Sequence, residues 1–494
     1  MSQNGIRDAR KLGYPKMMTL GVQHMFAMFG ATVLVPMITG LSVSATLLFA
    51  GLGTLLFHFL TKGKIPAFLG SSFAFLGGYA AITEWVDYKR NAAGELVIDE
   101  ETGEFIMEKM VHSQFLPYAC VGVFCAGLVY LLLAALIRTF GAQKVMRFFP
   151  PIVTGPIIIS IGITLASSAI DNCMKSWPIA LVAIAVVIIC NIWGKGMIKI
   201  IPILLGVIAS YAVAAIFGDV DFTKVAEAKW IGLPFGLEDT VFSLFTSAKE
   251  FVYGVPMNGP EAVTLEAAKA AGEGFATKGG LILTSIITIM PIALATIVEH
   301  IGDVCAISST VEENFIEEPG LHRTMLGDGL ATSLAALFGA PANTTYGENT
   351  GVLELSKVYD PKVVRIAAYI AILFSFCPKF AALVSSMPDA TIGGVSLILY
   401  GMISAVGVRN VVENKVDFTK SRNVIIAALI LVLALGIKFS AAGAISFMIG
   451  KVTISLSGLA VAAIVGIVLN AVLPGNDYVF GVDKKGDTSV NFKV

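Results

Sequence analysis

Long apolar stretches recur along almost the whole chain, and they constrain the fold more than any other feature. Only 14% of the 494 residues are Asp, Glu, Lys or Arg, and the mean hydropathy is +0.81, whereas a soluble domain carries roughly 25% charged residues. This composition excludes a soluble enzyme. A membrane-spanning helix needs about 20 apolar residues, so the apolar part of the chain has room for about fourteen spans. The sequence therefore predicts an all-α polytopic membrane protein.

The spans are predicted from the apolar stretches between charged or polar breaks. We place fourteen of them at residues 17–37, 44–60, 66–83, 115–137, 151–170, 177–193, 200–217, 280–305, 326–340, 345–356, 364–386, 391–408, 423–438 and 445–473. Lys and Arg concentrate in alternate connections, which the positive-inside rule places in the cytoplasm together with both termini. Residues 1–16 contain no short apolar run before a cleavage site, so we expect no signal peptide there.

Charge and cysteine content exclude other classes of protein. The net charge is −1, so no basic field exists to hold nucleic acid. The six cysteines lie in or beside apolar runs and lack metal-ligand spacing, so they are interpreted as small core residues. We expect no metal and no cofactor.

Two long connections are predicted on the external side. Residues 95–107 contain two short strand-like runs around Gly103, which predicts a hairpin. Residues 218–279 mix Gly, Pro and charge with short amphipathic pieces, which favours short interfacial helices in a connection between two halves.

The two halves share short motifs at a nearly constant separation. Val22-Gln23-His24 aligns with Val298-Glu299-His300 at an offset of 276, and Pro66-Ala67 aligns with Pro341-Ala342 at an offset of 275. The second alignment places Phe73 opposite Glu348. Seven spans in each half force the second copy to be inverted relative to the first. Inverted repeats are typical of secondary transporters, whose substrate lies near the midplane where interrupted helices meet.

Spans three and ten carry the expected interruptions. Residues 70–73 and 343–349 are small, polar and poor in helix formers, although they lie at membrane depth. Non-helical backbone is tolerated there only inside protein or along a cavity. We therefore predict two extended segments that pair antiparallel and leave two half-helix N-termini facing a central point. Such N-termini offer free N–H donors to a ligand.

Ionisable residues within spans cost about 2.5–3.5 kcal/mol each to insert, so they are candidates for function. Glu299, His300, Asp303 and Glu348 qualify. Glu299 and Asp303 are four residues apart and share a helix face. Two carboxylates on one face do not both ionise readily, so one is expected to hold a proton.

Structural alternatives remain open for each candidate. They are a packing pair for Glu299 and Asp303, a helix cap for Glu348, plain core for Phe73, and interhelix hydrogen bonds for His24 and His300. Asp328 is interpreted as a cap at a cytoplasmic helix end.

Five segments together resemble the nucleobase-ascorbate transporter family, and within it the bacterial uracil permeases. They are residues 23–32, 70–75, 299–303, 344–351 and 393–401. The resemblance covers essentially the whole chain. It implies a proton-coupled symporter with fourteen spans in two inverted sevens, embedded in a bacterial cytoplasmic membrane and forming a homodimer through its gate domains.

The resemblance also implies a division into domains. Residues 1–138 and 280–386 would form a core domain, residues 139–217 and 387–473 a gate domain, and residues 474–494 a cytoplasmic tail. By resemblance, the substrate-binding residues would be Glu299, Glu348, Phe73, Gly347, Ala31, Tyr346 and Tyr400. Proton coupling would involve Glu299, Asp303 and His300, with pocket support from His24, Ser72 and Asn349. Uracil permeases often carry His at the position of Asp303.

Uracil suits such a site because it is flat and neutral, with two ring N–H donors and two carbonyl acceptors. Four alternatives are weighed. A xanthine or urate permease of the same family is disfavoured because purine carriers typically have Gln at position 348. An anion exchanger of the same architecture is disfavoured because Glu299 and Glu348 would repel its substrate. A membrane enzyme is disfavoured because the sequence contains no catalytic motif. A channel is distinguished by experiment, since only a carrier shows saturable counterflow.

Overall fold

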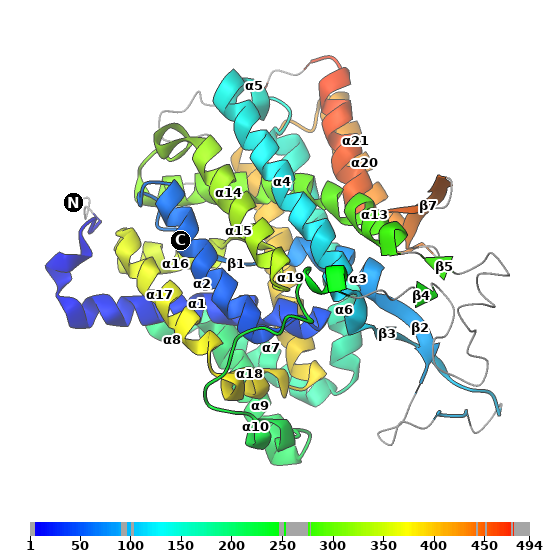
Figure 1. Ribbon diagram of the computed structural model, residues 1–494. Helices are drawn as coiled ribbons and strands as arrows, with labels where there is room; N and C mark the ends of the chain where they lie inside the picture. The colour runs from blue at the N-terminus through cyan, green and yellow to red at the C-terminus, as the bar shows by residue number, and fades with distance from the viewer. Residues whose placement is uncertain are drawn as a thin grey trace.

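The computed structural model describes residues 5–89, 96–99, 103–246, 251–252, 275–276, 278–440, 443–449, 452–475 and 478. Its helices form one bundle (Figure 1). Four two-stranded sheets occur among these residues. One of them, β1 with β6, lies inside the bundle, whereas β2 with β3 and the segments β4, β5 and β7 lie along its right-hand edge in Figure 1.

Several helices begin at a proline or end before a glycine. The longer ones are α1 (Tyr14–Thr39), α2 (Val43–Leu60), α4 (Leu116–Phe140), α6 (Pro151–Met174), α7 (Trp177–Ile192), α9 (Pro202–Phe217), α13 (Lys278–Ile289), α14 (Ala293–Val311), α15 (Leu321–Leu337), α17 (Pro361–Ser375), α19 (Asp389–Glu413), α20 (Ser421–Lys438) and α21 (Gly458–Val472). The shorter ones are α3 (Leu76–Thr83), α5 (Ala142–Met146), α8 (Met197–Ile200), α10 (Thr223–Glu227), α11 (Ser243–Thr246), α16 (Gly347–Ser356) and α18 (Pro378–Ser385), with single turns at η1 (Ala9–Leu12), η2 (Phe73–Phe75), η3 (Ser113–Phe115), η4 (Met290–Ile292) and η5 (Ile316–Gly320). Proline occupies the first turn of α1, α4, α6, α7 and α9, where its missing N–H has no helical partner to lose.

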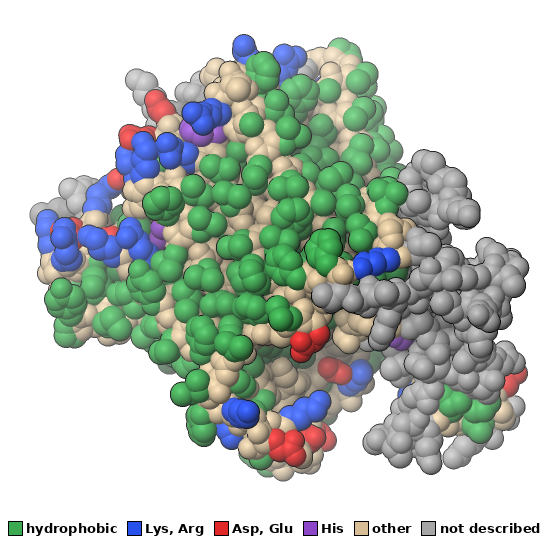
Figure 2. Space-filling view, viewed as in Figure 1, with side chains coloured by type: hydrophobic (Ala, Val, Ile, Leu, Met, Phe, Trp, Pro, Cys, Tyr) green, Lys and Arg blue, Asp and Glu red, His purple; other side chains and the backbone are tan. Residues whose placement is uncertain are grey.

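The outer surface of the bundle is apolar, as a membrane requires. Among the described residues, seven helices are long and apolar enough to cross a membrane, or eight if α17 and α18 form one bent span. Leu132, Ile192 and Val432 are 63–65% exposed. Figure 2 shows hydrophobic side chains across the middle of the visible face and Lys and Arg side chains at its left and top edges. The protein is therefore a multi-pass membrane protein.

Two predicted spans differ from the structure. The last span was predicted at 445–473, but β7 (Ala444–Ile449) and β8 (Val452–Ser457) pair antiparallel there, and α21 begins only at Gly458. Hydropathy does not distinguish apolar strands from a helix. The span predicted at 364–386 is bent by 90° between α17 and α18, because Pro378 has no N–H to continue the helix.

The predicted external connections are partly described. Strands β2 (Glu84–Tyr88) and β3 (Met107–Val111) pair antiparallel, and Ile98 forms a bridge with Phe105 in the region of the predicted hairpin. Residue 95 and residues 100–102 lie outside the described residues. In the second connection the structure describes α10, α11 and the short strands β4 (Phe251–Val252) and β5 (Phe275–Ala276). Lys379 of α18 donates to the carbonyl of Ala226 in α10 (3.3 Å).

The longer helices pack in two groups. In one group α4 packs along α15, α2 along α15 and α17, and α1 along α17. In the other, α6 packs along α19 and α20, α7 along α9 and α19, and α20 along α21. The buried residues Met28 and Val364 of the first group share one core cluster with Ala183 and Leu399 of the second.

The paired strands inside the bundle confirm the predicted antiparallel extended segments. β1 (Leu69–Ser71) and β6 (Asn343–Thr345) pair with Gly70 opposite Thr344. The Ser72 N–H donates to the Ala342 carbonyl (2.8 Å) and the Tyr346 N–H donates to the Phe68 carbonyl (3.0 Å). Each strand thereby satisfies buried backbone groups of the other, as the membrane interior requires.

We predict that Gly70→Ala destabilises the protein by about 1–3 kcal/mol, the usual range for an overpacked site. A methyl group there would overlap the Tyr346 ring and lie 2.8 Å from Thr32 Oγ1. Gly77→Ala in α3 is the matched control because a methyl group there meets nothing within 4 Å. The apparent unfolding temperature in detergent measures both variants. Equal unfolding temperatures for the two variants would contradict the close packing of Gly70 against Tyr346.

Candidate functional site

The strand crossing directs two helix N-termini toward the centre of the bundle. After β1 the chain continues through Ser72 into η2 and α3, and after β6 it continues through Tyr346 into α16. Ser72 and Tyr346 both have extended backbones, with ψ of 126° and 116°. The first N–H groups of a helix have no partner within the helix. The crossing therefore presents backbone donors on both of its sides.

Tyr346 holds the crossing together through its hydroxyl group. This hydroxyl donates to the Ser71 carbonyl (2.9 Å), and the Ser71 hydroxyl donates to the Thr32 carbonyl on α1 (2.8 Å). The Tyr346 side chain is 3% exposed. Its polar group is thus engaged within the protein, while its ring contributes to the wall of a cavity.

A cavity of about 390 Å³ lies beside the crossing. Its wall includes residues from α1, η2, α14, β6, α16 and α19, among them Phe26, Ala27, Phe73, Glu299, Asp303, Thr345, Gly347 and Leu399. It continues to a polar region with Asn191, Lys199, Glu354, Arg409, Asn410, Glu413 and Asn414. Leu399 and Glu413 are fourteen residues apart on α19, so the cavity extends for about 20 Å along that helix.

Two carboxylates of α14 face this cavity. Glu299 and Asp303 both line it, since their spacing places them on one side of the helix. The Thr345 hydroxyl donates to Asp303 Oδ2 (3.3 Å), and a methyl group on Gly347 would lie 3.3 Å from Asp303 Oδ1. Asp303 is therefore at the N-terminus of α16, where the helix dipole favours negative charge.

The aromatic wall of the cavity is Phe73, whose side chain is 6% exposed. The ring of Tyr400 on α19 meets the ring of Phe73 edge-on, with 5.8 Å between centroids and 75° between planes. Tyr400 itself is 1% exposed and lies behind Phe73. This geometry holds the Phe73 ring at a fixed angle next to the cavity.

Several residues expected at the site lie behind the cavity wall. Ala31 is fully buried, and Phe26 and Ala27 are the residues of α1 that line the cavity. Ser72 is also fully buried. The Asn349 amide nitrogen lies 3.4 Å from His24 Nδ1, so these two buried residues link α16 to α1. The backbone of Glu348 belongs to the first turn of α16, and its side chain lies outside the described residues.

His300 points away from the cavity and contacts a residue that the sequence analysis misplaced. Its Nδ1 lies 3.1 Å from Asp328 Oδ2, and both side chains are fully buried. Asp328 is in the middle of α15, so the predicted helix-end cap is wrong. The Thr345 hydroxyl also lies 3.3 Å from His300 Nδ1. Thr345 thus connects Asp303 in the cavity wall with the buried pair of His300 and Asp328.

The sequence held one signal for Asp328, since it is a carboxylate between Gly327 and Gly329 in an apolar stretch. The predicted span at 326–340 placed it near an end, whereas α15 begins five residues earlier, at Leu321. Among the described residues, no group of three or more His, Cys, Asp or Glu side chains is arranged to hold a metal ion.

The bundle with a partly polar cavity at a strand crossing is that of a membrane transporter rather than an enzyme, and comparison with known proteins agrees. The family model described as "Permease family" (Xan_ur_permease) matches residues 15–249 and 270–443. The uracil permease of Bacillus subtilis (strain 168) is 38% identical over 470 residues, covering 92% of each chain. The uracil permease of Bacillus caldolyticus is 38% identical over 480 residues, covering 95% of this chain and 94% of that protein.

The chain belongs to the nucleobase-ascorbate transporter family. A solved structure extends the likeness of fold beyond this family. The transmembrane domain of a cyanobacterium bicarbonate transporter, BicA, matches with a TM-score of 0.54 and 15% identity, over 94% of this chain and 99% of that one. At this identity the likeness concerns the fold alone.

We predict that His300→Gln and Asp328→Asn each destabilise the protein by about 3–5 kcal/mol, the typical cost of removing one partner of a buried pair. The double variant should lose much less than the sum, because neither buried group is then left without its partner. His58→Gln is the control, since this buried His bonds to the Ala67 carbonyl (2.9 Å) and should combine additively with Asp328→Asn. Unfolding temperatures of the single and double variants measure these effects. Additive losses for His300→Gln and Asp328→Asn would contradict the coupling between these two residues.

Proposed function

We propose that this protein is a proton-coupled secondary transporter that imports uracil across the cytoplasmic membrane of a bacterium. The observation that carries the proposal is the cavity beside the strand crossing, where Glu299, Asp303, Phe73 and the N-terminus of α16 come together. The proposal draws further support from the relatives named uracil permeases, which match nearly the whole chain.

The chemistry of the cavity matches the chemistry of uracil. Carboxylates accept hydrogen bonds from ring N–H groups, and in this proposal Glu299 and Glu348 fill that role. The backbone N–H groups of Phe73 and Gly347, at the starts of η2 and α16, donate to the two carbonyls. The Phe73 ring offers an apolar face to a flat base. Tyr346, Ala31, Tyr400, Ser72, His24 and Asn349 hold these groups in place.

The proposed architecture is fourteen spans in two inverted repeats of seven. The fourteen are α1, α2, η2–α3, α4, α6, α7, α9, α13–α14, α15, α16, α17–α18, α19, α20 and α21. If the two halves are repeats, each span corresponds to the span seven places away in the other half. Spans 4 and 9 (α4 and α15) then correspond to spans 11 and 2 (α17 and α2), and both pairs of helices pack against each other. Spans 6 and 12 (α7 and α19) likewise correspond to spans 13 and 5 (α20 and α6), and both of these pairs also pack together. The central pair of the crossing, Gly70 with Thr344, is separated by 274 residues, close to the offsets between the motifs.

Core and gate domains follow from the same packing. We assign residues 1–138 and 280–386 to the core and residues 139–217 and 387–473 to the gate. The first packing group then belongs to the core and the second to the gate, and the cavity lies between them. Alternating access would result from movement of the core against the gate. By resemblance, the gate domains also form the homodimer interface.

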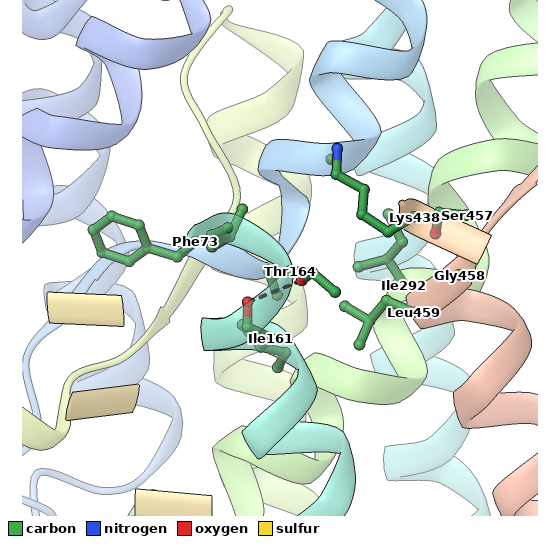
Figure 3. Close-up of a pocket in the computed structure, with 11 residues that line it drawn as sticks. Phe73, Ile161, Thr164, Ile292, Lys438, Ser457, Gly458 and Leu459 are labelled. Atoms are coloured by element: carbon green, nitrogen blue, oxygen red, sulfur yellow. Dashed lines mark hydrogen bonds between the residues drawn. The ribbon is translucent and has the colours of Figure 1, made fainter. Parts of the chain in front are cut away.

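In the part of the chain that the structure describes, the cavity extends to one side of the site. It reaches Lys199 and Arg409, which lie in connections that the positive-inside rule assigns to the cytoplasm. On the other side of Phe73, only about 40 Å³ of space remains between Ile161, Thr164, Ile292 and Leu459. Figure 3 shows the Phe73 ring directed away from Ile292, Leu459 and Lys438. We therefore interpret this conformation as inward-facing.

Uphill uptake of a neutral base requires a second species, and the pair Glu299 and Asp303 is the proposed proton site. A proton gains about 2.3 kcal/mol per 100 mV and about 1.4 kcal/mol per unit of pH difference. With Asp303 protonated, Glu299 stays ionised toward the base. The base and that proton are then released together to the cytoplasm, and the empty carrier returns without the proton, so one proton enters with each base. His300 acts as a positioning residue through Thr345.

We predict that Glu299→Gln and Glu348→Gln each weaken uracil binding by about 10- to 150-fold, because each change removes a charge-assisted acceptor. Isothermal titration of the detergent-solubilised protein with uracil measures this loss. Glu354→Gln is the control, because Glu354 lies two turns further along α16 in the polar part of the cavity. Binding of uracil by Glu348→Gln as tight as by the wild type would show that the site is wrongly assigned.

We predict that Asp303→Asn retains uracil binding but loses accumulation driven by a proton gradient, because Asn mimics the protonated carboxyl. Its binding should also depend less on pH than that of the wild type. Uptake into proteoliposomes with and without an imposed gradient provides the measurement. Gradient-driven accumulation equal to that of the wild type would place the proton elsewhere, with Glu299 the next candidate.

Competition distinguishes the proposed substrate from its alternatives. Radiolabelled uracil uptake should be reduced by unlabelled uracil and not by xanthine or bicarbonate. Inhibition by xanthine would favour a purine permease, and inhibition by bicarbonate an anion transporter.

A further inference from the structure

A second, larger hollow lies on the outer surface of the bundle, away from the proposed substrate site. It has a volume of about 460 Å³ and is bounded by α4, α5, α14 and α21, and ligand sites typically measure ~300–1,000 Å³. Leu136 and Phe140 of α4 form one wall, and Ile464 and Val468 of α21 form the other. These four side chains are 37–60% exposed. We call this hollow the α4–α21 groove.

The groove is open to the hydrocarbon of the membrane. Its walls belong to helices whose outer faces carry exposed apolar side chains, as Leu132 does on α4. In the view of Figure 2 hydrophobic side chains continue over this part of the face, and basic side chains appear at the top, where Figure 1 places α5. In a membrane, the molecules that contact such a groove are the acyl chains of lipids.

One end of the groove carries positive charge. Lys144 of α5 lines the groove, and Arg147 directly precedes Phe148, which also lines it. Both cationic side chains are exposed, and neither forms an ion pair within the described part of the chain. Asn470 near the end of α21 donates to the Arg147 carbonyl (3.1 Å), which holds this basic end against α21.

We propose that the α4–α21 groove binds one anionic phospholipid, with an acyl chain between α4 and α21 and the phosphate on Lys144 and Arg147. Basic side chains at the cytoplasmic ends of membrane helices typically hold anionic headgroups. A lysine that only extends its side chain to the membrane interface does not require a concave apolar wall next to it. The combination of a deep apolar groove and unpaired cations at its end selects a lipid with negative charge.

The groove also lies at a mechanically sensitive place. α5 is in the connection between α4 and α6, and α4 and α21 belong to different packing groups. If these groups are core and gate, which is part of the proposed function, a bound lipid fills the seam along which they move. Lipid binding itself does not depend on that assignment, so its test does not depend on uracil transport.

The test is native mass spectrometry of the full-length protein in detergent, titrated with palmitoyl-oleoyl phosphatidylglycerol or with the phosphatidylcholine of the same chains. The wild type should prefer phosphatidylglycerol. Lys144→Ala should weaken its binding by about fivefold, and Lys144→Ala with Arg147→Ala by roughly 30-fold, at the usual strength of one basic side chain near a membrane surface. Lys195→Ala, which removes an exposed lysine after α7, is the matched control and should change nothing.

A second variant tests the apolar part of the groove without changing charge. Val468→Trp should fill the groove and reduce retention of both lipids, whereas Val432→Trp, on the exposed face of α20, should reduce neither. Equal binding of the two lipids by the wild type, or unchanged binding by the double variant, would overturn the proposal. So would a change of oligomeric state in Val468→Trp with lipid retention unchanged, because the groove would then be an interface between copies of the chain.

Discussion

The pairing of β1 with β6 is the interaction on which the rest of the structure depends. An unpaired extended segment inside a membrane would leave its backbone N–H and C=O groups without partners, at a cost of several kcal/mol each. Two such segments that cross antiparallel satisfy one another, as Gly70 and Thr344 do at the centre of the pair. Because each strand ends where a short helix begins, the same crossing brings two helix N-termini into the interior. A structural requirement of the backbone thereby produces the candidate binding site.

The polar residues around the crossing form layers with different roles. Tyr346 and Ser71 use their polar groups to fasten the two strands to α1. Glu299 and Asp303 face the cavity. Behind them, Thr345 reaches both Asp303 and His300, and His300 contacts the buried Asp328. A change of charge at Asp303 is therefore felt by a fully buried pair between α14 and α15. This arrangement gives a physical route by which protonation in the cavity alters the packing of two helices.

The sequence predicted those features that leave a local signal. Small polar residues at membrane depth revealed the crossing, and the i, i+4 spacing predicted that Glu299 and Asp303 share a face. Features that depend on distant packing were missed. The partner of Asp328 lies on another helix, and no local pattern indicates it. The paired strands β7 and β8 were mistaken for part of a span because hydropathy does not distinguish apolar strands from an apolar helix. The resemblance placed Ala31 and Tyr400 at the site, whereas in this conformation both lie behind its wall.

The shared fold with a bicarbonate transporter shows that the scaffold alone does not decide the ligand. Helix N-termini at the crossing favour any group that accepts hydrogen bonds, and by themselves they favour an anion. In this chain the facing helix α14 contributes Glu299 and Asp303 to the same cavity. An anion would meet that negative charge at short range, whereas a neutral ligand with both donors and acceptors would pair with the carboxylates and the N-termini at once. Under the proposed function, selectivity on this scaffold therefore depends on the residues that α14 places opposite the crossing, and a carboxylate there would turn an anion site into one for a neutral, hydrogen-bonding ring.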